Sequence, residues 1–354
     1  MLNYVPLTQQ QYVDLLLNFI SSQEGHAATR YQNPRDHTTI GYGYTFFRNN
    51  NLALWQAAGI TLTSAEVALL QSIDAAPDSQ KDSLALQFTR SISKPEAVEL
   101  LRQTYPEYEG PANTLVMPFS EERIAFVSLT YNRGVLAVNT KMQAFFTAIG
   151  NQDRAEAWYQ IRYNSNGKRN DPDPTQGANG IANRRYAESN LFGLYENVAT
   201  TEAEAKSIFR MYTVHRGTIS GYESSFPPAT ATSRTFRDES FVARNLLLST
   251  FALFADAPVV SGEVLVGSNI GNRDNVPGND LLLGEARYNN LRGQGGDDII
   301  YGNIVGDDLY GDAGNDVLEG GEGRRKYRRG RFGWELGSNK REIEEIDDVC
   351  YGKV

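Results

Sequence analysis

The segment from residue 24 to residue 43, EGHAATRYQNPRDHTTIGYG, holds the side chains best placed by type and spacing for acid–base chemistry. Glu24 follows an apolar stripe at helical spacing, so we expect it at the last turn of a helix. Thr39, fifteen residues later, opens a run typical of a short strand or hairpin. A carboxyl group at such a helix end can be partly removed from water, which favours its protonated form.

This pairing suits the hydrolysis of a glycosidic bond. That reaction needs an acid beside the leaving oxygen and a second group that activates or holds water on the other face of the sugar ring. The Thr39 hydroxyl can orient a water molecule, and the glycines of TIGYG let a sugar approach the backbone. Tyr31 and Tyr42 can stack on sugar rings or simply pack a small lobe. The alternative is a helix-terminal glutamate followed by an ordinary hairpin.

The elements that must position this segment are mainly helices. Capping signals predict where four of them begin, and Gly25 and Gly134 are expected just past helix ends. The signals are Thr8 with Gln11, Thr63 with Glu66, Ser93 with Glu96, and Ser120. Further helices are expected in TKMQAFFTAI, DRAEAWYQIRY and ANRRYAESNLFGLYENV. We therefore predict a mainly helical domain over residues 1–200 and a helical connector over 201–260.

The opening segment resembles the catalytic signature of phage-type lysozymes, glycoside hydrolase family 24. Four later stretches resemble that family in the same order, so the similarity covers about residues 10–195. They are ISKPEAVELL, FVSLTYNRG, NTKMQAFFTAIGNQDRAEAW and GIANRRYAESNLF. The resemblance implies a mainly helical fold with a small hairpin lobe and, as substrate, the glycan of bacterial peptidoglycan.

Carried over residue by residue, the resemblance makes Glu24 the general acid and Thr39 the water-orienting hydroxyl. The family's aspartate falls on Asn33, which can accept a hydrogen bond from water but cannot take its proton. Asp36 can substitute if the loop folds it inward, and His37 is a weaker candidate base. Because the family inverts configuration, the second carboxylate is expected roughly 6.5–9.5 Å from Glu24.

The resemblance also implies supporting roles for three residues. Family members place an arginine of the last helix near the catalytic glutamate, so Arg184 or Arg185 can buttress Glu24; a surface arginine pair is the alternative. Asn132 matches an asparagine near the cleft of the family and can equally be a helix cap.

The chain also carries an internal repeat of nine residues. Its acidic positions are Asp280, Asn289, Asp298, Asp307 and Asp316, each followed two residues later by Leu or Ile and four residues later by Gly. This period predicts a parallel β-roll in which the aliphatic residues stack inward and the consecutive acidic positions form a ladder one strand spacing apart. The alternative is a glycine-rich acidic linker.

Calcium is the expected partner of this ladder. Aspartates so close repel one another, and a dication that prefers carboxylate and carbonyl oxygens removes that penalty. We predict metal ligation by Asp280, Asp298, Asp307 and Asp316, with weaker binding at Asn289. The region resembles the calcium-binding repeats of RTX proteins, which implies export by a type I secretion system and an extracellular location.

Composition sets the remaining limits. The net charge of −9 argues against a nucleic-acid partner, and the lone Cys350 excludes an internal disulfide. The N-terminus lacks the pattern of a Sec signal peptide, and no segment is long and apolar enough to span a membrane. Residues 261–323 are assigned to the β-roll and residues 324–354 to a disordered tail. A reading-frame slip that ended the repeats early is an alternative explanation for this tail.

The sequence therefore predicts an α+β protein, with a mainly helical domain and a small β-hairpin lobe followed by a short parallel β-roll. The leading hypothesis is a secreted muramidase whose C-terminal part depends on calcium and which needs no cofactor for catalysis. A non-catalytic wall-binding module is the alternative that Asn33 favours. A calcium-dependent adhesin or matrix protein is a third.

Overall fold

The computed structural model divides into two compact units, and each is described by itself. The described residues are 2–32, 37–166, 177–194, 207–208, 211, 215, 218–219, 221–227, 264–266, 270–271, 280–283, 288, 290–296, 298–301, 307–314, 316–319 and 326–329. One compact unit comprises Met1–Asn197 with Pro228–Ser233, and the other comprises Val198–Pro227 with Arg234–Val354. Most of the predicted connector, 201–260, lies outside the described residues.

Helix α1 (Gln9–Gln23) begins as the sequence predicts and ends differently. Thr8 and Gln11 form the expected capping box. At the other end, Glu24 is itself the C-cap in extended conformation, with φ −98° and ψ 140°, and its N–H bonds the carbonyl of Ile20. Gly25 does not take the left-handed conformation expected of a residue just past a helix end. The chain therefore leaves the helix at Glu24.

A three-stranded antiparallel sheet follows, in the order β1-β2-β3. Strand β2 (Thr39–Gly41) and strand β3 (Tyr44–Thr45) form the predicted hairpin, with Thr39 opposite Thr45. Strand β1 (Ala27–Tyr31), which the sequence did not predict, pairs with β2 and places Tyr31 opposite Thr39. None of its residues is fully buried, so it lacks the apolar alternation that marks a strand in a sequence.

The small lobe is completed by helices that surround an aromatic core. They are α2 (Asn51–Ala57), α3 (Ser64–Ala75), α4 (Asp78–Ala85) and α5 (Lys94–Thr104). Phe46, Trp55 and Phe88 are almost fully buried and pack together, with ring centroids 4.9–6.1 Å apart. The predicted capping boxes at Thr63 and Ser93 are both present.

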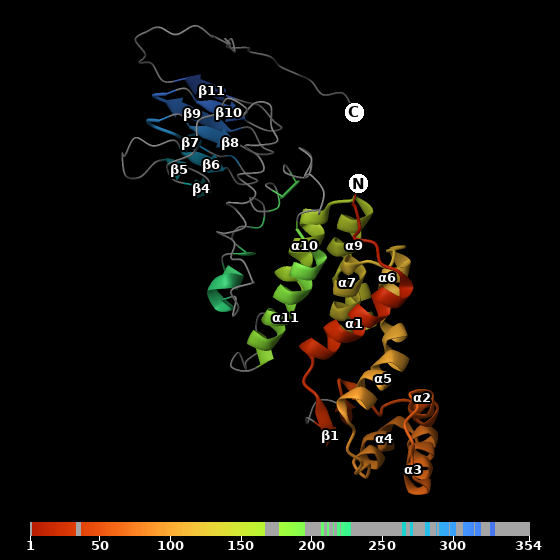
Figure 1. Ribbon diagram of the computed structural model, residues 1–354. Helices are drawn as coiled ribbons and strands as arrows, with labels where there is room; N and C mark the ends of the chain where they lie inside the picture. The colour runs from red at the N-terminus through yellow and green to blue at the C-terminus, as the bar shows by residue number, and fades with distance from the viewer. Residues whose placement is uncertain are drawn as a thin grey trace. The chain divides into compact units, whose positions relative to one another are not determined.

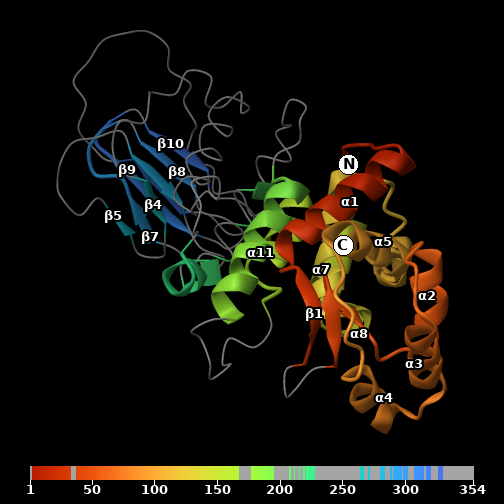
Figure 2. The ribbon, with the colours of Figure 1, turned by 60° about the horizontal axis from the view of Figure 1, so that its bottom comes forward.

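The larger helical part is built around α7 (Glu121–Arg133), which begins at the predicted Ser120 cap. Its other elements are η1 (Tyr105–Tyr108), α6 (Gly110–Thr114), α8 (Val135–Lys141), α9 (Gln143–Gly150), α10 (Arg154–Arg162) and α11 (Gly177–Phe192). Both α1 and α11 pack against α7, and Figures 1 and 2 show all three side by side. This packing brings the end of α1 close to α11. No helix among the described residues has the length and apolar character needed to cross a membrane.

The C-terminal unit contains the predicted parallel roll, with strands in two sheets (Figure 2). One has the order β10-β8-β6-β4 and the other β11-β9-β7-β5. The strands are β4 (Val264–Val266), β5 (Ile270–Gly271), β6 (Leu281–Leu283), β7 (Asn290–Arg292), β8 (Ile299–Tyr301), β9 (Asp308–Asp312), β10 (Val317–Glu319) and β11 (Lys326–Arg329). The repeated aliphatic residues form its core, as expected: Leu282, Leu291, Ile300 and Leu309 are fully buried, with Leu318 packed against them.

Two features of the roll differ from the sequence analysis. Consecutive nonapeptides alternate between the sheets, so Leu282 lies beside Ile300 rather than beside Leu291. A ladder step is therefore eighteen residues along the chain, not nine. In addition, β11 lies in the segment assigned to a disordered tail, where Tyr327 pairs with Leu309 in the same eighteen-residue register. Because KYRR lacks the glycine–aspartate pattern, the repeat itself could not reveal this strand.

Candidate active site and calcium-binding repeats

Glu24 lies at the C-terminal end of α1 and contacts Arg184 of α11. The Arg184 guanidinium donates through Nη1 to Glu24 Oε1. About a quarter of the Glu24 side chain is exposed (26%), whereas Arg184 is buried (5%). The arrangement gives the glutamate a fixed position while part of the carboxyl group still meets solvent.

Arg184 is held in turn by buried groups. Its Nε donates to Glu188 Oε1 at 2.9 Å, and its Nη2 donates to the Ser128 carbonyl at 3.0 Å. Burial by itself lowers the pKa of Arg184, but the carboxylates of Glu188 and Glu24 outweigh it and raise the pKa above the usual value. Arg184 therefore stays protonated.

The neighbouring arginine makes different contacts. Arg185 Nη1 donates to Glu188 Oε2 at 2.5 Å, and Arg185 Nη2 donates to Asn132 Oδ1 at 2.5 Å. Both arginines are buried, in contrast to the surface pair that the sequence also allowed. A chain of contacts thus runs from Glu24 through Arg184, Glu188 and Arg185 to Asn132 at the exposed end of α7.

Thr39 sits on β2 with its side chain 7% exposed. Its hydroxyl donates to the carbonyl of His37 at 2.8 Å. The hydroxyl oxygen keeps its acceptor lone pairs, so it can accept a hydrogen bond from a water molecule but has no second proton to donate.

His37, the weaker candidate base, is paired with a carboxylate of α4. Its Nδ1 lies 2.9 Å from Asp82 Oδ2, while the backbone N–H of Thr38 donates to Asp82 Oδ1 at 2.8 Å. The imidazole also stacks on Phe47, with ring centroids 3.7 Å apart. Burial acts in the opposite direction, but the bonds from His37 and Thr38 hold the pKa of Asp82 below its usual range. These contacts anchor the chain immediately before β2.

Tyrosines join the hairpin to the helices beside Glu24. Tyr131 of α7 donates its hydroxyl to the carbonyl of Tyr42 at 2.7 Å, and its ring lies 4.6 Å from that of Tyr108. Burial raises the pKa of Tyr131 and of Tyr108, and the charge of Glu24 adds to both increases. Both phenols therefore remain neutral. Tyr42 is 8% exposed, and Tyr31 is 46% exposed.

Two of the predicted site residues, Asn33 and Asp36, lie outside the described residues. In contrast, the contacts of Glu188, Ser128 and Tyr131 were not anticipated. Their sequence context offers no signal, because a glutamate or serine inside a helix looks the same whether it is buried or exposed.

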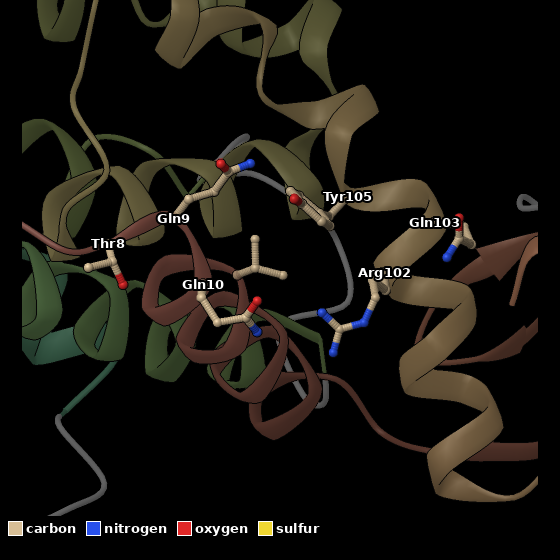
Figure 3. A pocket seen from close by; sticks show the side chains of 7 residues that line it. Thr8, Gln9, Gln10, Arg102, Gln103 and Tyr105 are labelled. Carbon is tan, nitrogen blue, oxygen red and sulfur yellow. The ribbon is translucent and has the colours of Figure 1, made fainter.

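A separate hollow lies between the start of α1 and the end of α5 (Figure 3). Its lining is mostly polar and comprises Thr8, Gln9, Gln10, Val13, Arg102, Gln103 and Tyr105. None of the candidate catalytic residues lines it.

Asp280, Asp298 and Asp316 form a ladder along one sheet, and Asp307 precedes a strand of the other sheet. The N–H of Asp280 donates to Asp298 Oδ1 at 2.8 Å, and the N–H of Asp298 donates to Asp316 Oδ1 at 3.0 Å. Asp280, Asp298 and Asp307 are almost fully buried. Neighbouring members of this ladder are eighteen residues apart, and Asn289 is not among the described residues.

The oxygen atoms of the roll that could bind a metal ion are of the kind that calcium prefers. A Cβ added at Gly293 would clash with Asp298 Oδ2 and lie 3.0 Å from the carbonyl oxygen of Gly311. A carboxylate oxygen and a carbonyl oxygen from successive turns thus border the same small space, and these are the ligands calcium prefers. Within the described part of the chain, three His, Cys, Asp or Glu side chains do not gather at one point.

Comparison with known families agrees with this division. The model of the phage lysozyme family matches residues 21–188. The model of the RTX calcium-binding nonapeptide repeat matches residues 275–308 and 304–324. A comparison with curated proteins gave no match.

Residues 21–188 of the N-terminal part therefore match the phage lysozyme family. The C-terminal part carries RTX calcium-binding repeats. Together the matches support a role like that of peptidoglycan hydrolases, with calcium bound by the repeats.

Proposed function

We propose that the protein is a muramidase that hydrolyses the glycan strands of bacterial peptidoglycan, with Glu24 as the general acid. The observation that carries this proposal is the position of Glu24 in a phage lysozyme domain: it ends α1, is fixed by Arg184, and remains partly exposed. A fixed carboxyl group that still meets solvent can reach a glycosidic oxygen.

Glu24 would protonate the leaving oxygen. Its Oε1 accepts from Arg184, so the acid proton is best carried on Oε2. As the bond between the sugar carbon and the bridging oxygen breaks, this proton passes to the oxygen and leaves Glu24 as a carboxylate. Arg184 then stabilises the carboxylate until a proton is regained from solvent.

Thr39 would orient the attacking water. Its hydroxyl donates a hydrogen bond to the backbone carbonyl of His37, so its oxygen is available to accept a hydrogen bond from the water. The bound water then directs a lone pair at the sugar carbon. A base must take the water's proton. Asp36 is the carboxylate of the intervening loop that can do so, whereas Asn33 can only help to hold the water.

The repeats would bind calcium through Asp280, Asp298, Asp307, Asp316 and adjacent backbone carbonyls. When bound, calcium neutralises the carboxylate ladder and so stabilises the folded roll. Because RTX repeats are typical of type I secreted proteins, we also propose secretion through a type I apparatus and an extracellular location, where the muramidase activity would be bacteriolytic.

A wall-clearing assay tests the proposed activity. Glu24→Gln keeps the size of the side chain but removes the acid proton, so turbidity of a cell-wall suspension should fall only with the unchanged protein. Glu99→Gln on α5, a half-exposed glutamate that pairs with Arg102, is the matched control and should clear walls normally. Equal clearing by wild type and Glu24→Gln, or clearing by neither, would refute the enzyme proposal.

The second candidate is a peptidoglycan-binding module or RTX adhesin-type protein without catalysis, favoured by Asn33 in place of the family's aspartate. The variant Asp36→Asn tests whether Asp36 is the second catalytic carboxylate. Loss of clearing with retained wall binding supports Asp36 as the second carboxylate, and full activity excludes it from that role. Binding to walls by a wild type that cannot clear them favours the module.

A further inference from the structure

We propose that Glu188 is a positioning residue for catalysis: it fixes Arg184 and balances its charge so that Glu24 can hold its proton. This inference rests on the proposed function of Glu24 as an acid. It concerns a side chain that neither the motif nor the spacing of the sequence singled out.

Glu188 is fully buried on α11 and both of its carboxylate oxygens are engaged. Ser128 Oγ donates to Oε1 at 2.8 Å, and Arg184 Nε donates to the same oxygen at 2.9 Å. Arg185 Nη1 donates to Oε2 at 2.5 Å. A buried carboxylate with three donors, two of them cationic, is held in one orientation.

This orientation fixes the guanidinium of Arg184. Its Nε points at Glu188, its Nη2 points at the carbonyl and the hydroxyl of Ser128, and its Nη1 is left for Glu24. Because the guanidinium is planar, anchoring two of its nitrogens determines the direction of the third. The position of Glu24 Oε1 therefore depends on Glu188 through Arg184.

Glu188 also sets the charge around Glu24. Arg184 and Arg185 contribute +2 and Glu188 contributes −1, so the group carries +1 when Glu24 is protonated and 0 when it is ionised. Without the Glu188 charge these values become +2 and +1. The added positive charge would draw the proton off Glu24, which a general acid must retain.

The other described groups near Glu24 do not compensate for this change. Tyr131 of α7 and Tyr108 of η1 interact with it, and burial raises the pKa of both phenols. They stay neutral through the range in which carboxyl groups titrate. Arg184 forms an ion pair with Glu24, and Glu188 is the buried counter-charge of Arg184.

The same domain offers a matched control. Glu122 of α7 pairs with Arg154 of α10 at 2.9 Å, and their side chains are 1% and 7% exposed. Glu122 also accepts from the N–H of Val5 at 3.1 Å. Replacing this carboxylate therefore removes a buried charge of the same kind, but none of its described contacts involves Glu24.

The test compares Glu188→Gln with Glu122→Gln in the full chain. Both variants should unfold at lower temperature, because each leaves a buried arginine without its carboxylate. Only Glu188→Gln should lower kcat, by about tenfold or more, with KM within about twofold and the alkaline limb of the pH–activity profile shifted to lower pH. Carbon NMR of labelled glutamate should show Glu24 titrating at lower pH in Glu188→Gln alone.

The outcomes separate this inference from the proposed function. If wild type has no activity, the muramidase proposal fails, and the NMR titration still decides whether Glu188 controls Glu24. A folded Glu188→Gln protein with unchanged kcat, pH profile and titration would overturn the inference. If that variant does not fold, Glu188→Asp replaces it: the retained charge should preserve the titration while the shorter side chain lowers kcat, and an unchanged kcat would overturn the positioning role.

Discussion

At the scale of single residues, the Thr39 hydroxyl has one assigned hydrogen bond and one proposed task. It donates to the carbonyl of His37, which leaves only its acceptor capacity for a water molecule. The neighbouring Thr38 hydroxyl donates instead to the carbonyl of Asp82 at 3.3 Å. Thr39 therefore has a proposed catalytic role, whereas the hydroxyl of Thr38 has only a structural one.

Replacing each threonine by valine distinguishes these uses. Thr39→Val and Thr38→Val should each lose about 1 kcal/mol of stability, because each removes one hydrogen bond at a buried site. Thr39→Val should also lower kcat by about 100-fold, whereas Thr38→Val should not. Calorimetry and single-turnover kinetics measure the two effects. Equal kcat values in the two variants would exclude a water-orienting role for Thr39.

The sequence predicted single residues only where a motif marks them. Glu24 and Thr39 stand out by their spacing, and Arg184 by its likeness to a family pattern. Glu188 could not be found in this way, since its distinction is complete burial between two arginines, which depends on how α7 packs against α11. The roles of Asn33 and Asp36 stay predictions.

At the scale of elements, the hairpin is tied to α7 through Tyr131. The turn between β2 and β3 leaves no room for a side chain at Gly43, where φ is +94° and an added Cβ would lie 2.9 Å from Tyr131 Oη. At Gly59, φ is +71° and an added Cβ meets open space. Both glycines have a positive φ, but only Gly43 lies close to another side chain, that of Tyr131.

Replacing each glycine by alanine therefore measures how much the contact between the β2–β3 hairpin and α7 contributes to stability. Gly59→Ala should destabilise the protein by about 1 kcal/mol, the approximate strain of a left-handed non-glycine residue. Gly43→Ala should cost about 2–3 kcal/mol, because it must also displace Tyr131 from Tyr42, and should reduce wall clearing. Chemical denaturation gives both values. Equal losses would show that the contact with Tyr131 contributes nothing.

The two edges of the roll differ in their proposed calcium ligands, because a ladder step is eighteen residues. Asp298 has Asp280 on one side and Asp316 on the other. The positions eighteen residues from Asp307 are Asn289 and Arg325. Asp298→Asn should therefore reduce calcium affinity by about tenfold and Asp307→Asn by less, as measured by calorimetric titration of the full chain. A larger effect at Asp307 would contradict this assignment of the edges.

Elements were predictable where local chemistry decides them. The caps at Thr8, Thr63, Ser93 and Ser120 were confirmed because each hydroxyl satisfies a backbone N–H within its own helix turn. Strand β1 was missed because its stability comes from pairing with β2 rather than from its own apolar pattern. Strand β11 was missed for the same reason, since its register is set by β9.

At the scale of the whole molecule, the proposed catalytic network and the repeats belong to different units. All described partners of Glu24 lie within Met1–Asn197, and the aspartate ladder lies within the other unit. The proposed acid catalysis is therefore assigned to one unit and the proposed calcium binding to the other.

Calcium removal tests this independence. A chelator should abolish the β-sheet contribution of the roll in circular dichroism of the full chain, because the carboxylates then repel one another. Wall clearing per molecule should stay within about twofold, since calcium has no place in the proposed acid catalysis. Parallel loss of both signals would show that the roll supports the active domain, and an unchanged spectrum would contradict calcium-dependent folding.

The most direct measurement of the central claim is product analysis of purified peptidoglycan. If Glu24 protonates the glycosidic oxygen, wild type releases new reducing ends of muramic acid, Glu99→Gln matches it, and Glu24→Gln releases about 100-fold fewer. Equal release by wild type and Glu24→Gln, or the release of peptides without new reducing ends, would contradict it.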